Sequence, residues 1–90
     1  MELRGLKYFL MVAREENISK AAALLHVTQP TLSRQLMQLE DELGAPLFVR
    51  QRTGVCLSPA GRALEQMAPA YLRQTETIRA EVIKAACHRD

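Results

Sequence analysis

The side chains best suited to chemistry in this sequence are the arginine, glutamine and threonine residues gathered in residues 28–44, TQPTLSRQLMQLEDELG. In a helix that advances about 100° per residue, they lie away from a stripe of leucines. The outward positions are Pro30, Arg34 and Gln38, with Thr31 and Gln35 on the flank. Side chains of these types can reach base edges and phosphates in a major groove. We therefore interpret the segment as a DNA-recognition helix.

Both ends of this helix carry boundary signals. Thr28 is a suitable N-cap, because its hydroxyl can accept a hydrogen bond from a free amide of the first turn, and Pro30 fits that turn. Gly44 marks the end of the helix, and Pro46 prevents its continuation. The apolar stripe that we expect to face the core consists of Leu32, Leu36, Leu39 and Leu43.

Length and composition indicate one small domain. Ninety residues with 48% apolar side chains can form a modest core but cannot enclose a large substrate cavity. The net charge of +2 excludes a polybasic coat for nucleic acid, so the positions of the charges matter more than their sum. The basic side chains stand in segments without acids: Lys20 and Arg34 in residues 17–39, Arg50 and Arg52 in residues 43–57.

Several classes of function find no support in the residues. Cys56 and Cys87 lie far apart without metal-ligand spacing, which indicates free thiols in a reducing cytoplasm and no metal or other cofactor. We find no charged-then-apolar leader and no apolar run that could cross a bilayer, so neither targeting nor membrane contact is expected. The sequence has no nucleophile and base constellation and no glycine-rich phosphate loop, so we do not expect an enzyme.

Two helices are expected before the recognition helix. Residues 3–16 place their apolar side chains on one face, which predicts a supporting helix. Asn17 interrupts it, and Ser19 is expected to cap a short second helix over residues 20–25, where small alanines permit close packing. A tight turn at residues 26–27 then leads into the recognition helix. Two helices joined in this way form the helix-turn-helix pattern.

Short β-prone runs follow the recognition helix. Residues 47–52 predict a strand, residues 53–54 a turn and residues 55–58 the partner strand. The sequence therefore predicts a small hairpin, or wing, which is marginal alone and should lean on the helical core. The expected contacts with the core are Leu47 or Phe48, and Leu57.

The wing carries two arginines without a compensating acid. Arg50 and Arg52 suit contact with a phosphate backbone or with the minor groove beside the recognition helix. The alternative is a solvated edge strand that its charges protect from aggregation. The pattern leaves open which face of the strand points inward.

Ser58 and Pro59 begin a long final helix, as its N-cap and first residue. A domain this small cannot cover a long apolar seam, so the same helix of a second subunit is the expected partner in a twofold dimer. A missing downstream domain is the alternative partner. Pro69 predicts a kink near residues 65–68, away from the seam. The seam has heptad-like spacing and consists of Leu64, Ala68, Tyr71, Thr75, Ile78, Val82 and Ala85.

Plainer interpretations of the same residues stay open. The polar face of residues 28–44 could be an ordinary solvated surface, or it could bind a protein in a winged-helix interaction module. Lys20 near a helix start opposes the macrodipole, which favours a phosphate contact only slightly over a plain surface lysine. His26 is interpreted as a turn or packing residue rather than a ligand. The acid-free basic segments favour DNA.

The residues also carry a resemblance to a known family. The chain resembles the N-terminal signature of bacterial LysR-type transcriptional regulators, in order and without a gap, over about residues 3–71. The matching positions are Ala21-Ala22, Leu25, Thr28-Gln29-Pro30, Ser33-Arg34-Gln35, Leu39-Glu40, Leu43-Gly44, Leu47-Phe48, Arg50, Arg52, Leu57-Ser58 and Ala60-Gly61. The resemblance implies a mainly α fold, a winged helix-turn-helix of three helices plus a two-stranded wing, followed by a long linker helix.

The resemblance implies sequence-specific binding of double-stranded DNA, with the recognition helix in the major groove and the wing on the backbone or minor groove. The base-contacting residues are then Gln29, Pro30, Thr31, Ser33, Arg34 and Gln35. We expect phosphate or wing contacts from Ser19, Lys20, Thr28, Gln38, Arg50 and Arg52.

The same resemblance implies a division of the chain. Residues 1–58 are expected to form the DNA-binding domain, and residues 59–90 the linker and dimerisation helix. Antiparallel pairing of two linker helices would let two recognition helices read an interrupted inverted repeat. The family also has an effector-binding domain, absent from this chain, through which a full-length tetramer would meet a small-molecule effector.

Overall fold

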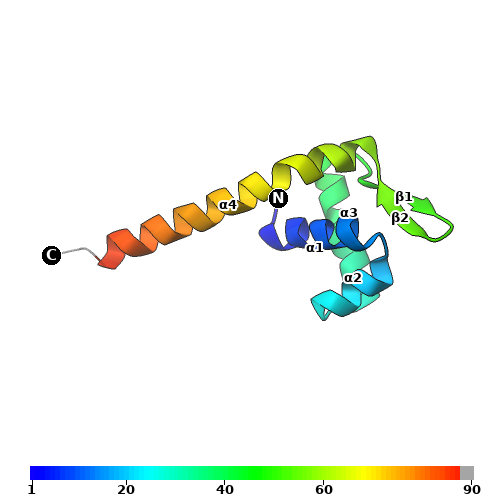
Figure 1. Ribbon diagram of the computed structural model, residues 1–90, viewed down its shortest axis with the longest axis horizontal. Helices are drawn as coiled ribbons and strands as arrows, with labels where there is room; N and C mark the ends of the chain where they lie inside the picture. The colour runs from blue at the N-terminus through cyan, green and yellow to red at the C-terminus, as the bar shows by residue number, and fades with distance from the viewer. Residues whose placement is uncertain (88–90) are drawn as a thin grey trace.

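Four α-helices and one β-hairpin make up the computed structural model, which describes residues 1–87. Figure 1 shows three short helices and the hairpin gathered at one end, with the last helix projecting away from them. This confirms the predicted winged helix-turn-helix followed by a long helix. The elements are α1 (Leu3–Glu15), α2 (Ile18–Leu25), α3 (Gln29–Leu43), β1 (Phe48–Gln51), β2 (Gly54–Leu57) and α4 (Pro59–Cys87).

The break between α1 and α2 is shorter than the sequence suggested. Glu16 takes a left-handed conformation and its amide donates to the Val12 carbonyl, which closes α1. Asn17 is extended, and its side-chain oxygen accepts a 2.8 Å hydrogen bond from the Lys20 amide. The predicted cap at Ser19 is therefore wrong, because the Asn17 side chain satisfies that amide and starts α2 one residue before Ser19.

The boundaries of α3 are confirmed by their cap geometry. The Thr28 hydroxyl accepts a hydrogen bond from the Thr31 amide at 3.3 Å, and Gly44 closes the helix with φ of 71°. Leu32, Leu36 and Leu39 are buried, as predicted for the stripe. Leu43 is 44% exposed, which corrects the fourth position, because α3 extends beyond the elements that cover its first three leucines.

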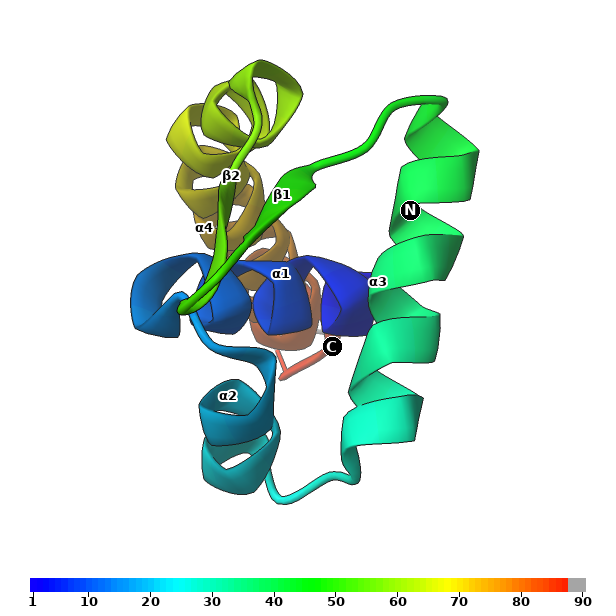
Figure 2. The same ribbon diagram turned by 90° about the vertical axis from the view of Figure 1, so that its right-hand side faces the viewer.

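The core lies where α1 crosses the other elements. Figure 2 shows α1 running across the middle of this part of the molecule, with α2 below it, α3 at its side, the hairpin and the start of α4 above, and the rest of α4 passing behind. Phe9 and Val12 of α1 are fully buried, and they share the core with Ala21 and Ala22 of α2. The small alanines therefore permit the close helix packing that the sequence predicted.

The hairpin pairs β1 with β2 in antiparallel register, with Gln51 opposite Gly54. The turn is therefore Arg52–Thr53, one residue earlier than predicted. Gly54 begins β2 instead of completing the turn. Its φ is 150°, and a Cβ at this position would clash with the Glu16 carbonyl oxygen, so the strand can approach Glu16 only with a glycine here. The Val55 amide donates to that same oxygen at 3.1 Å, which ties the hairpin to the turn between α1 and α2.

The hairpin also leans on the core through its side chains, as predicted. Leu47, directly before β1, is buried, and the Phe48 ring packs on Phe9 with 5.3 Å between ring centroids. Leu57 packs half-buried against the core, and Val55 is buried in it. The contact of Val55 with the core was not predicted from the sequence.

The start of α4 is confirmed by the bonds of Ser58. Its hydroxyl oxygen accepts a 3.0 Å hydrogen bond from the Gly61 amide and donates to the Pro46 carbonyl at 2.7 Å. From Pro59 the helix runs unbroken through Pro69 to Cys87, the last described residue. The final three residues of the predicted 59–90 segment lie outside the described residues.

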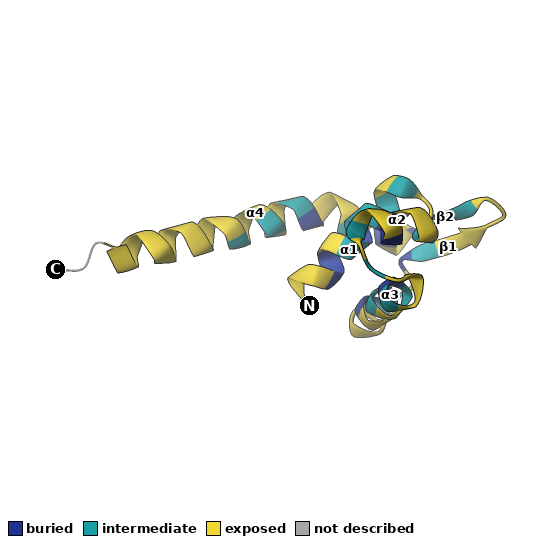
Figure 3. Cartoon of the chain, turned by 90° about the horizontal axis from the view of Figure 1, so that it is seen from below, coloured by how far each residue is buried: buried dark blue, intermediate teal, exposed yellow. Residues whose placement is uncertain are grey.

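Burial changes sharply along α4. Figure 3 shows buried and half-buried positions near its start and exposed positions along the rest. Ala68 is buried and Leu64 packs against the core, while Thr75 is half-buried. Beyond Thr75 every described residue of α4 is exposed.

Candidate nucleic-acid interface

The outer face of α3 gathers three of the six predicted base-contacting residues, Thr31, Arg34 and Gln35. An open hollow on this face is lined by Thr31, Arg34, Gln35, Met37, Gln38 and Asp41. The Arg34 side chain is exposed, so its guanidinium is free to meet a planar acceptor pair such as a guanine edge. Asp41 brings an acid to the far end of the hollow. The phosphate-attracting part of the face therefore belongs to the first half of α3.

Gln35 and Thr28 are less free than the sequence suggested. Gln35 is half-buried and also lines a hollow with Glu2 and Gly5, on the α1 side of α3. The Thr28 hydroxyl donates to the Thr31 hydroxyl at 2.8 Å and also caps the helix. A phosphate that bound Thr28 would share its hydroxyl with this cap.

The strand register answers the open question about Arg50. Arg50 lies directly opposite Val55, and residues opposite each other in an antiparallel pair share a face. Because Val55 is buried, Arg50 lies on the face of the hairpin turned toward the helices. It lines a hollow of about 140 Å³ with Ser33 and Met37 of α3. The wing arginine and the recognition helix thus border one surface.

A further hollow joins α2, α3 and both strands of the hairpin. It measures about 280 Å³ and brings Ser19 of α2, Gln29 of α3 and Arg50 of β1 together. The Ser19 hydroxyl donates a 2.9 Å hydrogen bond to Oε1 of Gln29. Arg52, by contrast, lies exposed in the hairpin turn and lines none of these three hollows.

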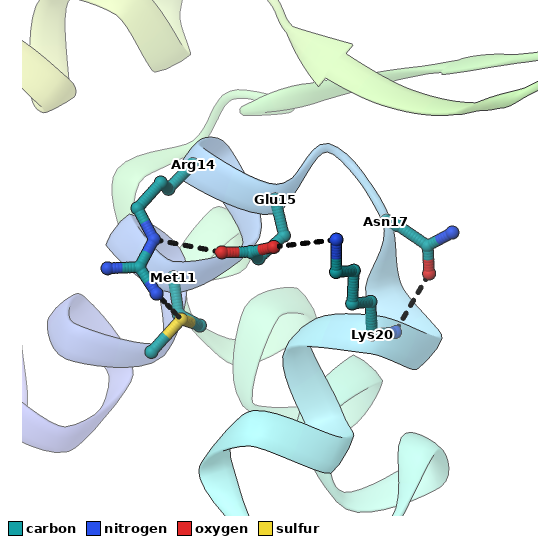
Figure 4. Close-up of polar contacts among 5 residues, drawn as sticks. All are labelled: Met11, Arg14, Glu15, Asn17 and Lys20. Carbon is teal, nitrogen blue, oxygen red and sulfur yellow. Dashed lines mark hydrogen bonds and ion pairs between the residues drawn. The ribbon is translucent and has the colours of Figure 1, made fainter.

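Lys20 points toward an acid that its own sequence segment lacks. Figure 4 shows its amine facing Glu15 of α1, and Nζ lies 3.5 Å from Oε1. Nε of Arg14 donates to the other Glu15 oxygen at 2.9 Å. The hydrogen bond from Arg14 and the charge of Lys20 lower the pKa of Glu15 below 4.5, against the opposing effect of burial. The expected freedom of Lys20 from acids is therefore corrected, because folding brings Glu15 beside it.

Sequence reasoning missed two residues that border the interface. Glu40 Oε2 accepts a 2.7 Å hydrogen bond from the Leu47 amide, so this carboxylate ties α3 to the start of the hairpin. Met37 is 60% exposed between the two hollows that border α3. The signal for Glu40 was its place one turn after Leu36 on the helix face, whereas an exposed methionine gives no such signal.

The predicted seam on α4 divides into two parts. Ala68 is buried and Leu64 packs against the core of its own chain, so this part of the predicted seam is already covered without a second subunit. Tyr71, Ile78 and Val82 are 43%, 53% and 62% exposed. The Thr75 hydroxyl donates to the Leu72 carbonyl of its own helix at 2.7 Å, and Ala85 is exposed.

Two features are absent from residues 1–87. Over this range, no three histidine, cysteine, aspartate or glutamate side chains gather where a metal ion could bind. In the same part of the chain, no helix combines the length and apolar character needed to cross a membrane.

Known proteins are similar to this chain in both sequence and fold. Residues 3–62 match the family described as bacterial regulatory helix-turn-helix protein, lysR family. The chain is 55% identical over 73 residues to the HTH-type transcriptional regulator CatR of Pseudomonas putida, covering 81% of this chain and 25% of that protein. It is 40% identical over 89 residues to a probable cat1 operon transcriptional activator of Acinetobacter lwoffii, covering 99% and 29%.

Solved structures with the same architecture include complexes with DNA. The DNA-binding domain of CbnR in its DNA complex has a TM-score of 0.89 and 40% identity, covering 96% of this chain and 99% of that chain. The BenM domain bound to benA site 1 DNA has a TM-score of 0.87 and 37% identity, covering 99% and 100%.

The fold and the polar face of α3 thus define a winged helix-turn-helix DNA-binding domain of a transcription regulator. The chain belongs to the LysR family of bacterial regulatory helix-turn-helix proteins. It spans between a quarter and a third of the length of the two curated relatives, 25% and 29%.

Proposed function

We propose that this domain binds double-stranded DNA sequence-specifically, with α3 in the major groove and the hairpin on the adjacent backbone or minor groove. The observation that carries the proposal is the position of Arg50. It borders one hollow with Ser33 of α3 and another with Gln29, so a duplex on α3 meets the wing arginine as well. Similar domains have been solved as complexes with DNA, which supports DNA binding by this domain.

Within this arrangement the contacts divide by chemistry. Groups that reach base edges carry sequence information, whereas phosphate contacts fix the register of the protein on the duplex. We assign base contacts to Gln29, Pro30, Thr31, Ser33, Arg34 and Gln35. We assign phosphate and wing contacts to Ser19, Lys20, Thr28, Gln38, Arg50 and Arg52. Lys20 has to exchange Glu15 for a phosphate to play this part.

Assembly forms the next part of the proposal. Residues 1–58 act as the DNA-binding domain, and residues 59–90 act as the linker helix that pairs antiparallel with its copy. Exposed Ile78 and Val82 support this pairing. The two domains of a homodimer would then read an interrupted inverted repeat. In a longer protein, a following domain would bind a small-molecule effector and complete a tetramer.

The proposed cellular role is transcription regulation in the cytoplasm of a bacterium, without enzymatic activity. The curated relatives named above are transcriptional regulators, which supports this role. The non-enzymatic role can be checked with the pure domain, since turnover of any substrate by it would contradict the proposal.

Selection from random duplexes tests the DNA-binding proposal. The domain is mixed with a pool of random duplexes, the tightest binders are sequenced, and fluorescence anisotropy then measures affinity over a range of salt. We expect a twofold-symmetric site that binds at least about 10³-fold more tightly than random DNA. Affinity should fall steeply with salt, because Lys and Arg contacts displace counterions.

Three outcomes have distinct meanings. A symmetric selected site supports the proposed reading by α3. Salt-sensitive binding without sequence preference would contradict sequence-specific recognition by this domain and leave specificity to the longer protein. Failure to bind at any salt would support the alternative, a winged-helix module whose α3 surface binds a protein, for which exposed Met37 offers an apolar contact.

A further inference from the structure

The contact between Ser19 and Gln29 joins the two helices of the helix-turn-helix. Ser19 is the second residue of α2, and Gln29 is the first residue of α3. The Ser19 hydroxyl donates to Gln29 Oε1 over 2.9 Å, although ten positions separate the two residues. Within residues 1–87, this is the only side-chain hydrogen bond between α2 and α3. It therefore ties a predicted base-contacting residue to a helix outside α3.

The anchor for this bond is held in place by the fold. Asn17 caps the start of α2 by accepting a hydrogen bond from the Lys20 amide. Ser19 follows this cap by two residues. Ala21 and Ala22 of the same helix are buried in the core. A hydroxyl on so fixed a helix can restrict the Gln29 side chain, which would otherwise turn about its three side-chain torsions. The exposed Gln29 is thus held in one arrangement before DNA arrives.

The direction of the bond decides which group Gln29 presents. Its Oε1 accepts from Ser19, so the NH2 group at Nε2 of the side-chain amide is the group left to meet a ligand. In a major groove, this amide NH2 donor matches N7 and O6 of guanine, N7 of adenine or O4 of thymine. Cytosine itself presents only its N4 donor there, so at a C·G pair the Gln29 donor has to bond the paired guanine instead.

We propose that Ser19 is a positioning residue that sets the base preference of Gln29, by holding its Oε1 and turning its Nε2 toward the bases as a donor. The inference rests on the proposed function, in which α3 lies in the major groove. Ser19 gives its single hydroxyl proton to Gln29, so this role replaces the phosphate contact proposed for it above, which would carry no sequence information. Ser19 would therefore affect specificity without touching a base.

The first test compares base preferences among matched variants. Wild type, Ser19→Ala, Ser19→Thr and Gln29→Ala are measured by anisotropy on every single-base-pair variant of the selected site. Ser19→Ala should weaken the preference at the Gln29-dependent position by about three- to ten-fold, the factor for one neutral hydrogen bond. Ser19→Thr should restore it, because threonine keeps the hydroxyl.

A double variant and a control complete this test. Ser19→Ala combined with Gln29→Ala should lose no more base preference than Gln29→Ala alone, because each change removes the same hydrogen-bonded arrangement of the Gln29 side chain. Thr53→Ala is the matched control: Thr53 borders the same hollow, so its hydroxyl is lost from the same surface without loss of the bond to Gln29. Equal weakening by Ser19→Ala on all duplexes would overturn the proposal.

The second test needs no DNA and separates this proposal from the proposed function. NMR relaxation of the Gln29 side-chain amide reports how restricted that group is on the picosecond to nanosecond timescale. The order parameter should be high in the wild type and in Ser19→Thr, and it should fall in Ser19→Ala. A restricted amide without sequence-specific binding would contradict the DNA proposal only. An amide equally mobile in wild type and Ser19→Ala would overturn the positioning role.

Discussion

The two halves of this molecule treat their apolar side chains in opposite ways. In the head, residues 1–58, each helix covers the stripe of another, and Leu32, Phe9 and Leu47 are buried. In the outer part of α4, from Glu76 to Cys87, the apolar side chains of the predicted seam stay exposed. The same helical periodicity thus gives a closed core in one region and an open surface in the other. The difference shows that packing within one chain covers the apolar side chains of the head, with the start of α4 against it, and leaves those of outer α4 open.

The largest expected effect comes from opening the closed core. Leu32→Ala removes a fully buried side chain from α3 and should lower the free energy of unfolding by about 2–5 kcal/mol. Urea denaturation measures this loss. The comparison further predicts that the loss is the same at low and high protein concentration, because Leu32 packs within one chain.

Met37→Ala is the matched control on the same helix. Met37 is exposed, so its truncation should change the free energy of unfolding by about 0.5 kcal/mol or less. A loss at Met37 as large as that at Leu32 would mean that α3 is covered on both faces, which would break the distinction between closed and open surfaces.

The second prediction concerns the joint between the hairpin and the helices. Gly54→Ala should cost about 1–3 kcal/mol of stability, because φ of 150° disfavours alanine. The added Cβ would also meet the Glu16 carbonyl oxygen at 2.2 Å. The control is Gly44→Ala, where φ is 71° and no atom lies within 4 Å, so only the left-handed conformation costs about 1 kcal/mol. Equal losses of unfolding free energy in the two variants would show that the hairpin is not fixed to the turn between α1 and α2.

The third prediction addresses the open surface. Ile78→Ala should weaken association of two chains by about ten-fold, or about 1.4 kcal/mol, because Ile78 loses apolar contact in the proposed dimer. Sedimentation over a range of concentrations measures the change. Arg79→Ala, the next residue on the same exposed helix, should leave association unchanged. A wild type that stays monomeric at every concentration would contradict the pairing of α4.

Helix boundaries could be predicted from the sequence because their signals are local. Thr28 and Gly44 bound α3, and Ser58 caps α4, each through contacts with near neighbours in the chain. The inward face of the wing could not be predicted, since alternation shows that Phe48 and Arg50 share a face without showing which face is covered. The register against Val55 supplies that information.

The remaining errors arise where folding joins distant segments or where a helix leaves the core. Lys20 stands in an acid-free segment, yet α1 brings Glu15 beside it. Ala68 fits a heptad seam, yet α4 turns it onto the head. Leu43 fits the leucine stripe, yet no element covers it. Periodicity identifies residues that share a face, whereas tertiary packing decides what that face meets.

The smallest expected effect distinguishes polar from apolar support within the head. Glu15→Gln removes the charge that Arg14 and Lys20 share and should lower stability slightly at neutral pH. The pKa of Glu15 is lowered in the folded protein, so its stabilisation is present above the ordinary value of 4.5 and is lost as pH falls through the lowered pKa. The difference between wild type and variant should therefore shrink in acid.

Urea midpoints of both proteins, measured between about pH 7 and pH 2, test that sign. Added salt should also reduce the difference, because exposed charges are screened. A difference that grows toward acid would require a Glu15 pKa raised by burial, which the neighbouring Arg14 and Lys20 oppose. Since all three side chains belong to the head, the variant should leave association through α4 unchanged. A shift in association would mean that the two regions are coupled rather than independent.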